Sequence, residues 1–181
     1  MKALKKDELK EILIKNWMTH DAMWFYNCLQ ECGIEKTNKI NKAAVRAMGT
    51  IEIKRIKKAV GIEKVETFED FKSLSDAIWS IAKGDFMKFT YSYPEENVMR
   101  ADFQNCFAYD GIKLLGSIGQ YKCGIFDRIY AWYDEMGLKY SVFPTVTGCM
   151  MHTDGKCFRE LTFTFSKNKV AKSCPQAMLT K

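Results

Sequence analysis

Residues 87–104 read MKFTYSYPEENVMRADFQ, and this stretch decides the fold. Apolar and polar residues alternate from Met87 to Tyr93 and again from Met99 to Gln104, which is the two-residue period of a strand with one buried face. The segment Pro94-Glu-Glu-Asn97 between the two runs is typical of a turn. We therefore predict a β-hairpin here.

Upstream of the hairpin the apolar period is about 3.6 residues, which indicates helices. We predict helices over Lys5–Asn16, from Thr19 or Asp21 to Cys32, and from Asn38 as a cap to Val60. Gly33 and Gly61 follow the second and third helices and suit the left-handed position after a helix. Thr67 and Asp70 resemble a capping box, which predicts a fourth helix that ends before Gly84.

Downstream, two more helices and a second hairpin are expected. Asn105 can cap a short helix that reaches Leu115, and a further helix runs over Tyr121–Met136 and stops at Gly137. Alternation then resumes over 138–142, before Pro144, and over 157–165. The order predicts an α+β fold, with N-terminal helices, a hairpin, two helices and a hairpin, in which helices pack on an antiparallel sheet of about four strands. We assign one domain to 1–181: 1–84 mainly helical, 85–166 α+β, and 167–181 a polar tail.

The composition indicates a soluble protein with a buried core. Of the 181 residues, 47% are hydrophobic and 28% are charged, which is enough apolar side chain for one globular domain. The charged N-terminus does not resemble an export signal, and no apolar run approaches the roughly 18 residues of a membrane helix. Seven cysteines, an odd number, then suggest reduced thiols. We expect a cytoplasmic protein with no membrane partner.

The net charge of +6 arises in the first third of the chain. Residues 1–64 hold 14 Lys and Arg against 8 Asp and Glu, whereas residues 65–181 hold 14 of each. The densest run, Lys54-Arg55-Ile56-Lys57-Lys58, is typical of the solvated face of a helix. Neither a recognition helix nor base-stacking aromatic residues accompany it, which argues against nucleic-acid binding.

The segment Cys149-Met-Met-His152-Thr-Asp-Gly-Lys-Cys157 is the strongest indication of a metal site. Thiolate and imidazole are the usual ligands of zinc, so Cys149, His152 and Cys157 are candidate zinc ligands, with Cys123 or Cys106 as the fourth. The alternative is structural, because Asp154-Gly155 also reads as a hairpin turn.

Two further cysteines are candidates for nucleophilic catalysis. Cys106 follows the predicted cap and Cys123 lies in the first turn of the next predicted helix, where the helix dipole favours a thiolate. His152 is then the candidate base. The alternative is that both thiols are small hydrophobic side chains of the core.

Aromatic residues concentrate in the first predicted hairpin and the helices after it. Helices that cover a sheet can leave an apolar pocket, and we expect Tyr91, Phe103, Tyr121 and Tyr130 to line it. The alternative is that these rings fill the core between the two layers.

Residues 85–166 resemble two groups of proteins. The order of elements, with Asn105-Cys106, Tyr121-Lys-Cys123-Gly and Gly148-Cys149 through Cys157, resembles the vinyl-reductase-type small-molecule sensor domains, whose fold is shared by a vesicle-tethering subunit that holds an acyl chain. The stretch from Cys123-Gly-Ile-Phe-Asp127 to Phe158-Arg-Glu160 is similar to cytosolic families related to the aminothiazoline-carboxylate hydrolases. The first resemblance implies a small-molecule sensor and the second a hydrolase.

The sequence thus favours a binding or sensing protein with a partly apolar pocket. A hydrolase of a small heterocycle or amide, which uses a cysteine thiolate or a zinc-bound water, is the first alternative. An assembly protein without a ligand is the second, and a homodimer is one state that the sequence allows.

Overall fold

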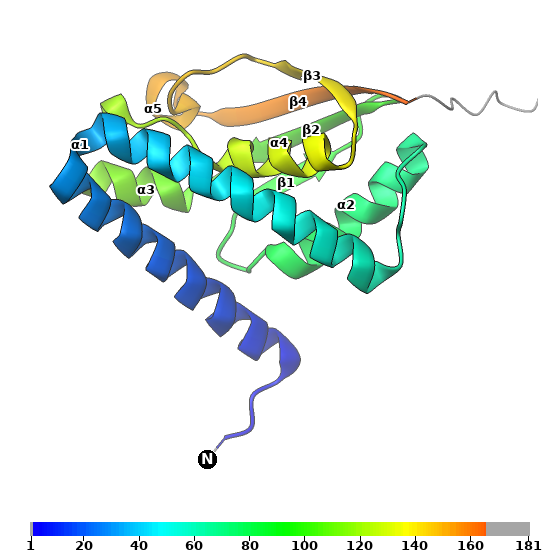
Figure 1. Ribbon diagram of the computed structural model, residues 1–181, viewed down its shortest axis with the longest axis horizontal. Coiled ribbons are helices and arrows are strands. Elements are labelled where there is room, and N and C mark those ends of the chain that lie inside the picture. The colour runs from blue at the N-terminus through cyan, green and yellow to red at the C-terminus, as the bar shows by residue number, and fades with distance from the viewer. Residues whose placement is uncertain (1, 166–181) are drawn as a thin grey trace, which may run out of the picture.

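In the computed structural model, which describes residues 2–165, helices lie on one side of a four-stranded antiparallel sheet (Figure 1). The strands are β1 (Phe89–Ser92), β2 (Val98–Phe103), β3 (Lys139–Phe143) and β4 (Cys157–Thr164), in the order β1-β2-β4-β3. Both predicted hairpins form, since β1 pairs with β2 and β3 pairs with β4. The predicted α+β class and the number of strands are confirmed.

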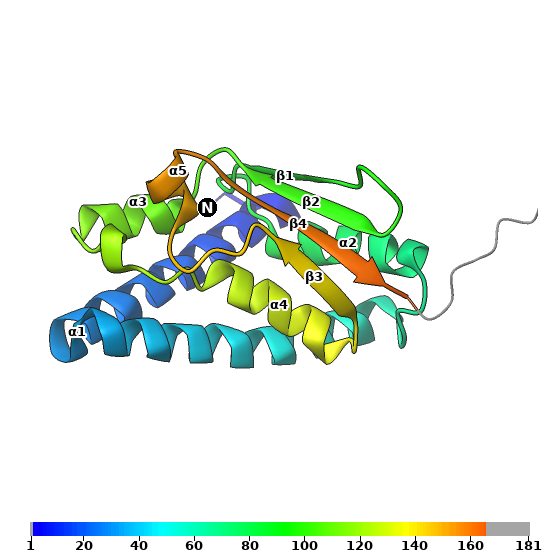
Figure 2. The ribbon, with the colours of Figure 1, turned by 90° about the horizontal axis from the view of Figure 1, so that it is seen from above.

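The alternation along each strand explains why only one face of the sheet carries helices (Figure 2). On β4, Leu161 and Phe163 are buried while Thr162 and Thr164 are exposed. Met99 and Ala101 on β2 are buried and stand opposite Leu161 and Arg159. Successive side chains point to opposite faces, so the apolar set of every strand meets the helical layer.

Helix α1 (Lys6–Val60) is interrupted once, at Gly33. The backbone there has φ 71° and ψ 168°, a region open in practice only to glycine, and the chain turns sharply. We call Lys6–Cys32 arm 1 and Ile34–Val60 arm 2, and the two arms form a V in Figure 1. The predicted helix ends at Gly33 and Gly61 are confirmed, whereas the predicted break between Asn16 and Thr19 and the helix start at Asn38 were wrong.

Asn38 was predicted as a helix cap and is instead buried inside arm 2. Its side-chain Nδ2 donates to the carbonyl of Gln120 at 2.8 Å, and its Oδ1 accepts from the backbone N–H of Lys122 at 2.9 Å. Both hydrogen-bond partners of this amide lie more than 80 residues further along the chain. It consequently joins arm 2 to the middle of the protein rather than starting a helix.

Helix α2 (Phe68–Ala82) begins as the sequence predicts. The backbone N–H of Asp70 donates to Thr67 Oγ1 at 3.2 Å, and Thr67 N–H donates to the Asp70 carboxylate at 2.9 Å. These two bonds satisfy backbone donors that the first turn of a helix leaves free. The helix then buries Phe71 against Phe163 of β4, with ring centroids 4.3 Å apart, so α2 packs on the sheet.

The remaining helices differ from prediction at their starts. They are α3 (Phe107–Leu114), the short 3-10 helix η1 (Ile118–Gln120), α4 (Ile125–Glu135) and α5 (Met150–Asp154). Cys106, not Asn105, stands at the cap of α3. Helix α4 begins at Ile125, and Lys122, which lies before the helix, donates its backbone N–H to Asn38. Gly155, predicted in a hairpin turn, ends α5 in the left-handed conformation.

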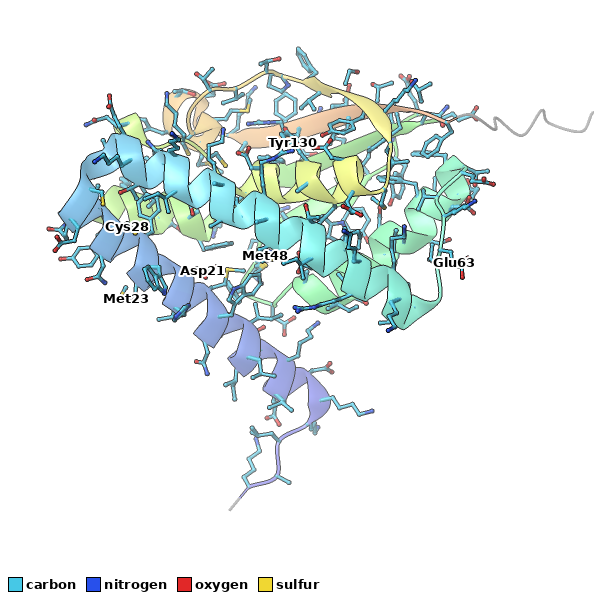
Figure 3. The ribbon with its side chains drawn as sticks, viewed as in Figure 1. Asp21, Met23, Cys28, Met48, Glu63 and Tyr130 are labelled. Carbon is cyan, nitrogen blue, oxygen red and sulfur yellow. The ribbon has the colours of Figure 1, made fainter. Side chains whose placement is uncertain are left out.

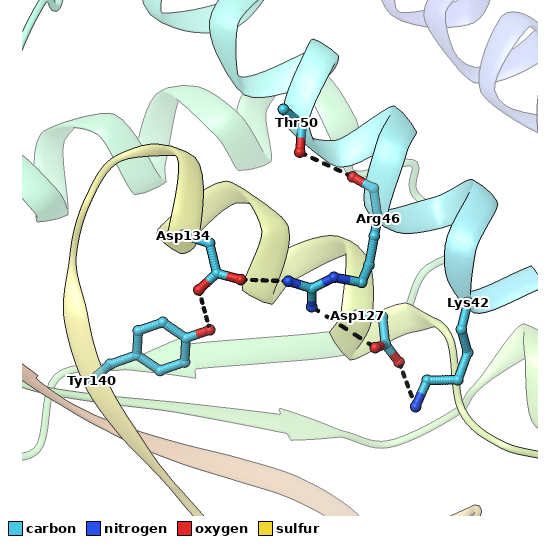
Figure 4. Close-up of polar contacts among 6 residues, drawn as sticks. All are labelled: Lys42, Arg46, Thr50, Asp127, Asp134 and Tyr140. Carbon is cyan, nitrogen blue, oxygen red and sulfur yellow. Dashed lines mark hydrogen bonds and ion pairs between the residues drawn. The ribbon is translucent and has the colours of Figure 1, made fainter.

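Arm 2 and α4 lie side by side and are held by polar contacts along their length (Figure 4). Lys42 pairs with Asp127 at 3.2 Å, and Arg46 reaches both Asp127 and Asp134. Tyr140 of β3 donates to Asp134 at 2.9 Å. The sheet is thereby connected to arm 2 through α4.

Two remaining expectations concern the membrane and the tail. Within residues 2–165, none of the helices combines the length and apolarity needed to cross a bilayer. The predicted polar tail, 167–181, lies outside the described residues.

Candidate ligand cavity

A cavity of about 520 Å³ lies between the two arms of α1, helices α3 and α4, and the start of β1. Its size falls within the about 300–1,000 Å³ of small-molecule sites, and its lining is largely apolar. The large side chains around it come from every neighbouring element: Trp17, Met18, Phe25, Met48, Trp79, Met87, Phe89, Phe103, Tyr121, Ile129 and Trp132.

Spacing along the two arms explains why these residues face the cavity. Trp17, Asp21 and Phe25 recur at intervals of four and share one face of arm 1, while Val45 and Met48 share a face of arm 2. In Figure 3, Asp21 and Met48 lie on the sides of the two arms that face each other. Because Gly33 turns the chain back, one continuous stretch of sequence supplies two opposite walls.

A polar network forms one end of the lining. Arg128 of α4 donates from Nε to Glu52 Oε2 at 2.8 Å and from Nη2 to Glu52 Oε1, a two-point ion pair between α4 and arm 2. Trp132 Nε1 also donates to Glu52, at 2.9 Å. The guanidinium lies 4.6 Å from the ring centroid of Trp17, so it contacts arm 1 as well. Arg128 therefore ties both arms to α4.

Asp21 is the acidic residue of the lining, and its side chain is half-exposed. His20 Nδ1 lies 3.9 Å from its carboxylate, too far for an ordinary hydrogen bond. Desolvation raises the pKa of the Asp21 carboxyl, while His20 and Arg128 act in the opposite direction. The net effect is a raised pKa, so partial desolvation of the carboxylate outweighs these two neighbours.

Two of the four predicted ligand-binding residues line the cavity, namely Phe103 and Tyr121. The Tyr121 hydroxyl is buried and accepts from the backbone N–H of Gly124 at 3.3 Å. Tyr91 and Tyr130 lie outside the lining. The Tyr91 hydroxyl donates to Asp76 at 2.8 Å, and the Tyr130 ring packs on Phe126, so both tyrosines belong to the layer between sheet and helices.

The thiols predicted as nucleophiles are not activated. Cys106 lines the cavity, and burial raises its pKa to about 11. Burial also raises the pKa of Cys123, and it raises the pKa of Cys157 to about 12. The buried Arg159 opposes the shift at Cys123 and Cys157 without overcoming it. At neutral pH these three groups are thiols, and nucleophilic attack needs the thiolate.

Of the predicted zinc ligands, Cys149 and Cys157 lie near enough for Cys149 to contribute to the raised pKa of Cys157, whereas His152 lies apart from them in solvent. Cys149 packs beside the cluster of Phe25, Ile112 and Tyr121, Cys157 packs on the main core, and His152 is exposed on α5. Across residues 2–165, no three His, Cys, Asp or Glu side chains are grouped so that they could hold a metal ion. His152 lies on α5, where its side chain is exposed.

Sequence reasoning missed Trp17, Asp21, Glu52 and Arg128. The spacing of Trp17, Asp21 and Phe25 on one helical face was an available signal for the arm 1 wall. The pairing of Glu52 with Arg128 joins residues 76 positions apart and has no local signature.

Comparison with known proteins identifies one family model and no characterised relative. Residues 2–82 match a family of unknown function, DUF6125. The matched region holds both arms of α1 and the whole of α2, and hence Trp17, Asp21, Glu52 and Trp79 of the cavity region. No curated protein and no solved structure matches the chain.

Proposed function

We propose that this protein binds a small, partly apolar molecule in the cavity between the arms of α1 and acts as a binding or sensing module. The observation that carries the proposal is the cavity itself, about 520 Å³ in volume and walled by aromatic and methionine side chains. A concave, largely apolar pocket of this volume is typical of a small-molecule site. The resemblance to small-molecule sensor domains agrees with this proposal.

The chemistry of the lining favours binding over hydrolysis. Cys106 is the cysteine of the lining, and its thiol is protonated at neutral pH. Among the described residues that line the cavity there is no histidine to act as its base. His152 is exposed on α5, and His20 on the outer side of arm 1 accepts a hydrogen bond from Trp24 at 3.2 Å.

The proposal is tested with N-phenyl-1-naphthylamine, an uncharged probe that fluoresces in apolar sites. Trp17, Trp79 and Trp132 line the cavity, so a bound probe should quench their emission by energy transfer. We expect saturable binding of one probe per chain. Binding that rises without saturation, or with many probes per chain, contradicts a defined cavity.

A pair of alanine variants locates the probe. Ala108 lines the cavity and Ala44 is exposed on arm 2 outside the lining. Ala108→Phe should reduce probe affinity at least about tenfold by occupying the space, while Ala44→Phe should leave the affinity unchanged. Equal affinity in the two variants would place the probe elsewhere and overturn the proposal.

A further inference from the structure

Charge is unevenly balanced around the cavity. Of the described residues that line it, only Asp21 and Arg128 carry a formal charge. Glu52 neutralises Arg128 through two hydrogen bonds at its carboxylate, and the Trp17 ring covers the guanidinium. Asp21 makes no such two-point contact among the described residues, and His20 Nδ1 approaches its carboxylate only to 3.9 Å. The wall therefore carries one excess negative charge, located on arm 1.

His20 is the titratable neighbour of Asp21 on arm 1, and its contact with the carboxylate is long. His20 Nε2 accepts a hydrogen bond from Trp24 Nε1 at 3.2 Å, and Nδ1 lies 3.9 Å from the Asp21 carboxylate, beyond ordinary hydrogen-bonding distance. Desolvation raises the pKa of Asp21, and His20 and Arg128 oppose this shift without overcoming it. A closer cationic partner would therefore stabilise the carboxylate.

Aromatic walls around a carboxylate suit one kind of ligand. The electron-rich faces of tryptophan, tyrosine and phenylalanine attract cations, and a carboxylate accepts hydrogen bonds from an ammonium group. Trp17 and Phe25 lie on the same face of arm 1 as Asp21, one turn to either side. An anionic ligand would instead meet the Asp21 charge and an arginine that is already paired.

We propose that the cavity selects amphiphilic cations, with the apolar body of the ligand among the aromatic side chains and a protonated amine on the Asp21 carboxylate. This inference rests on the proposed function and specifies the class of ligand. The ammonium group forms a charge-assisted hydrogen bond with Asp21, and no covalent step is involved.

The test is displacement of bound N-phenyl-1-naphthylamine by three compounds that share one apolar body. These are 4-phenylbutylamine, 4-phenylbutanol and 5-phenylpentanoate, which are cationic, neutral and anionic at pH 7.5. We expect the amine to bind at least about tenfold more tightly than the alcohol, since a hydrogen bond between charged groups is stronger than a neutral one. The carboxylate should bind more weakly than the alcohol.

Variants of arm 1 assign the preference to one residue. Asp21→Asn should abolish the preference for the amine over the alcohol. Asp7→Asn is the matched control, because Asp7 is an exposed acid of the same arm outside the lining, and it should preserve the preference.

The outcomes separate the two proposals. If the neutral probe and the alcohol bind but the amine shows no preference, or if Asp21→Asn keeps the preference, the cation inference is overturned and the cavity proposal stands. If neither the probe nor any of the three compounds binds, the proposed function is overturned and the inference with it.

Discussion

Arm 1 and arm 2 are halves of one helix, yet they are held in very different ways. Arm 2 buries five residues and is joined to α4 by ion pairs, whereas arm 1 buries only Ile14 and Phe25. Several large apolar side chains of arm 1 remain exposed, among them Leu13 at 59% and Trp24 at 63%. One wall of the cavity is thus firmly packed, and the other rests on few contacts.

The difference shows how one wall of a cavity can be firmly held while the other opens more easily. Buried contacts determine how much free energy is needed to open a segment locally, and arm 1 has few of them. Arm 2, α4 and the sheet form the packed part that holds Glu52 and Arg128 in place. Arm 1 adds Trp17 and Asp21 to this scaffold and turns at Gly33.

The largest effect is expected where arm 2 approaches α4 most closely. A Cβ at Gly49 would lie 2.7 Å from the backbone oxygen of Arg128 and 3.2 Å from Ala131 Cβ. Gly49→Ala should therefore lower the free energy of unfolding by about 3 kcal/mol, measured by urea denaturation. Gly111→Ala on α3 is the control, because a Cβ there meets nothing within 4 Å, and it should stabilise by about 0.5–1 kcal/mol. Similar effects at both positions would contradict the tight contact.

The next effect concerns the ion pair at the end of the cavity. Arg128 and Glu52 are 14% and 18% exposed, so Glu52→Ala leaves a largely buried guanidinium without its partner and should cost about 2–3 kcal/mol. Lys54 pairs with Glu135 between the same two helices but is 61% exposed, and Lys54→Ala should cost under about 0.5 kcal/mol. Equal losses in urea denaturation would show that burial does not distinguish the two pairs.

Substitution of Gly33, at the junction of the arms, should lower both the free energy of unfolding and the affinity for the probe. Gly33→Ala forces a side chain into a backbone region that favours glycine and should cost about 1–2 kcal/mol. No other atom lies near the added Cβ, so the expected relaxation is a change in the direction of arm 1, which weakens binding of N-phenyl-1-naphthylamine. Gly61→Ala, at the far end of arm 2, should cost about 1 kcal/mol and leave the probe affinity unchanged.

The smallest effect is expected on the outer face of arm 1. Trp24→Ala should change the free energy of unfolding by less than about 0.5 kcal/mol, because the ring is mostly in solvent. Its neighbour Phe25 is 8% exposed and packs on Tyr121, and Phe25→Ala should cost about 3 kcal/mol. A large loss at Trp24, in the same thermal or urea measurement, would show that arm 1 has a partner on its outer side.

The sequence predicted an element correctly where the hydrogen-bond partners of its residues lie nearby in the chain. The Thr67 and Asp70 pair starts α2 as expected, and Gly61 and Gly137 follow their helices in the left-handed conformation. The alternation over residues 87–104 correctly predicted the first hairpin. Asn38 failed as a cap because its amide has partners at residues 120 and 122, which no local pattern reveals.

The candidate site was predicted only in part, for the same physical reason. Phe103 and Tyr121 were expected in a pocket and line the cavity. Tyr91 and Tyr130 have the same residue type and neighbourhood in the sequence, but α2 and Phe126 cover them. Cys149 and Cys157 lie near each other and are partly buried, whereas His152, close to them in sequence, is exposed on α5.

The sequence by itself determined the α+β class, the two hairpins and most helix ends, since these follow from apolar periodicity and from caps within a few residues. Only the tertiary structure decided that arm 1 and arm 2 face each other across a cavity, that Glu52 forms an ion pair with Arg128, and that Asp21 lines the cavity with His20 no closer than 3.9 Å. Periodicity shows which face of a helix is apolar. The packing of distant segments determines what that face meets, and therefore which charge in the cavity is available to a ligand.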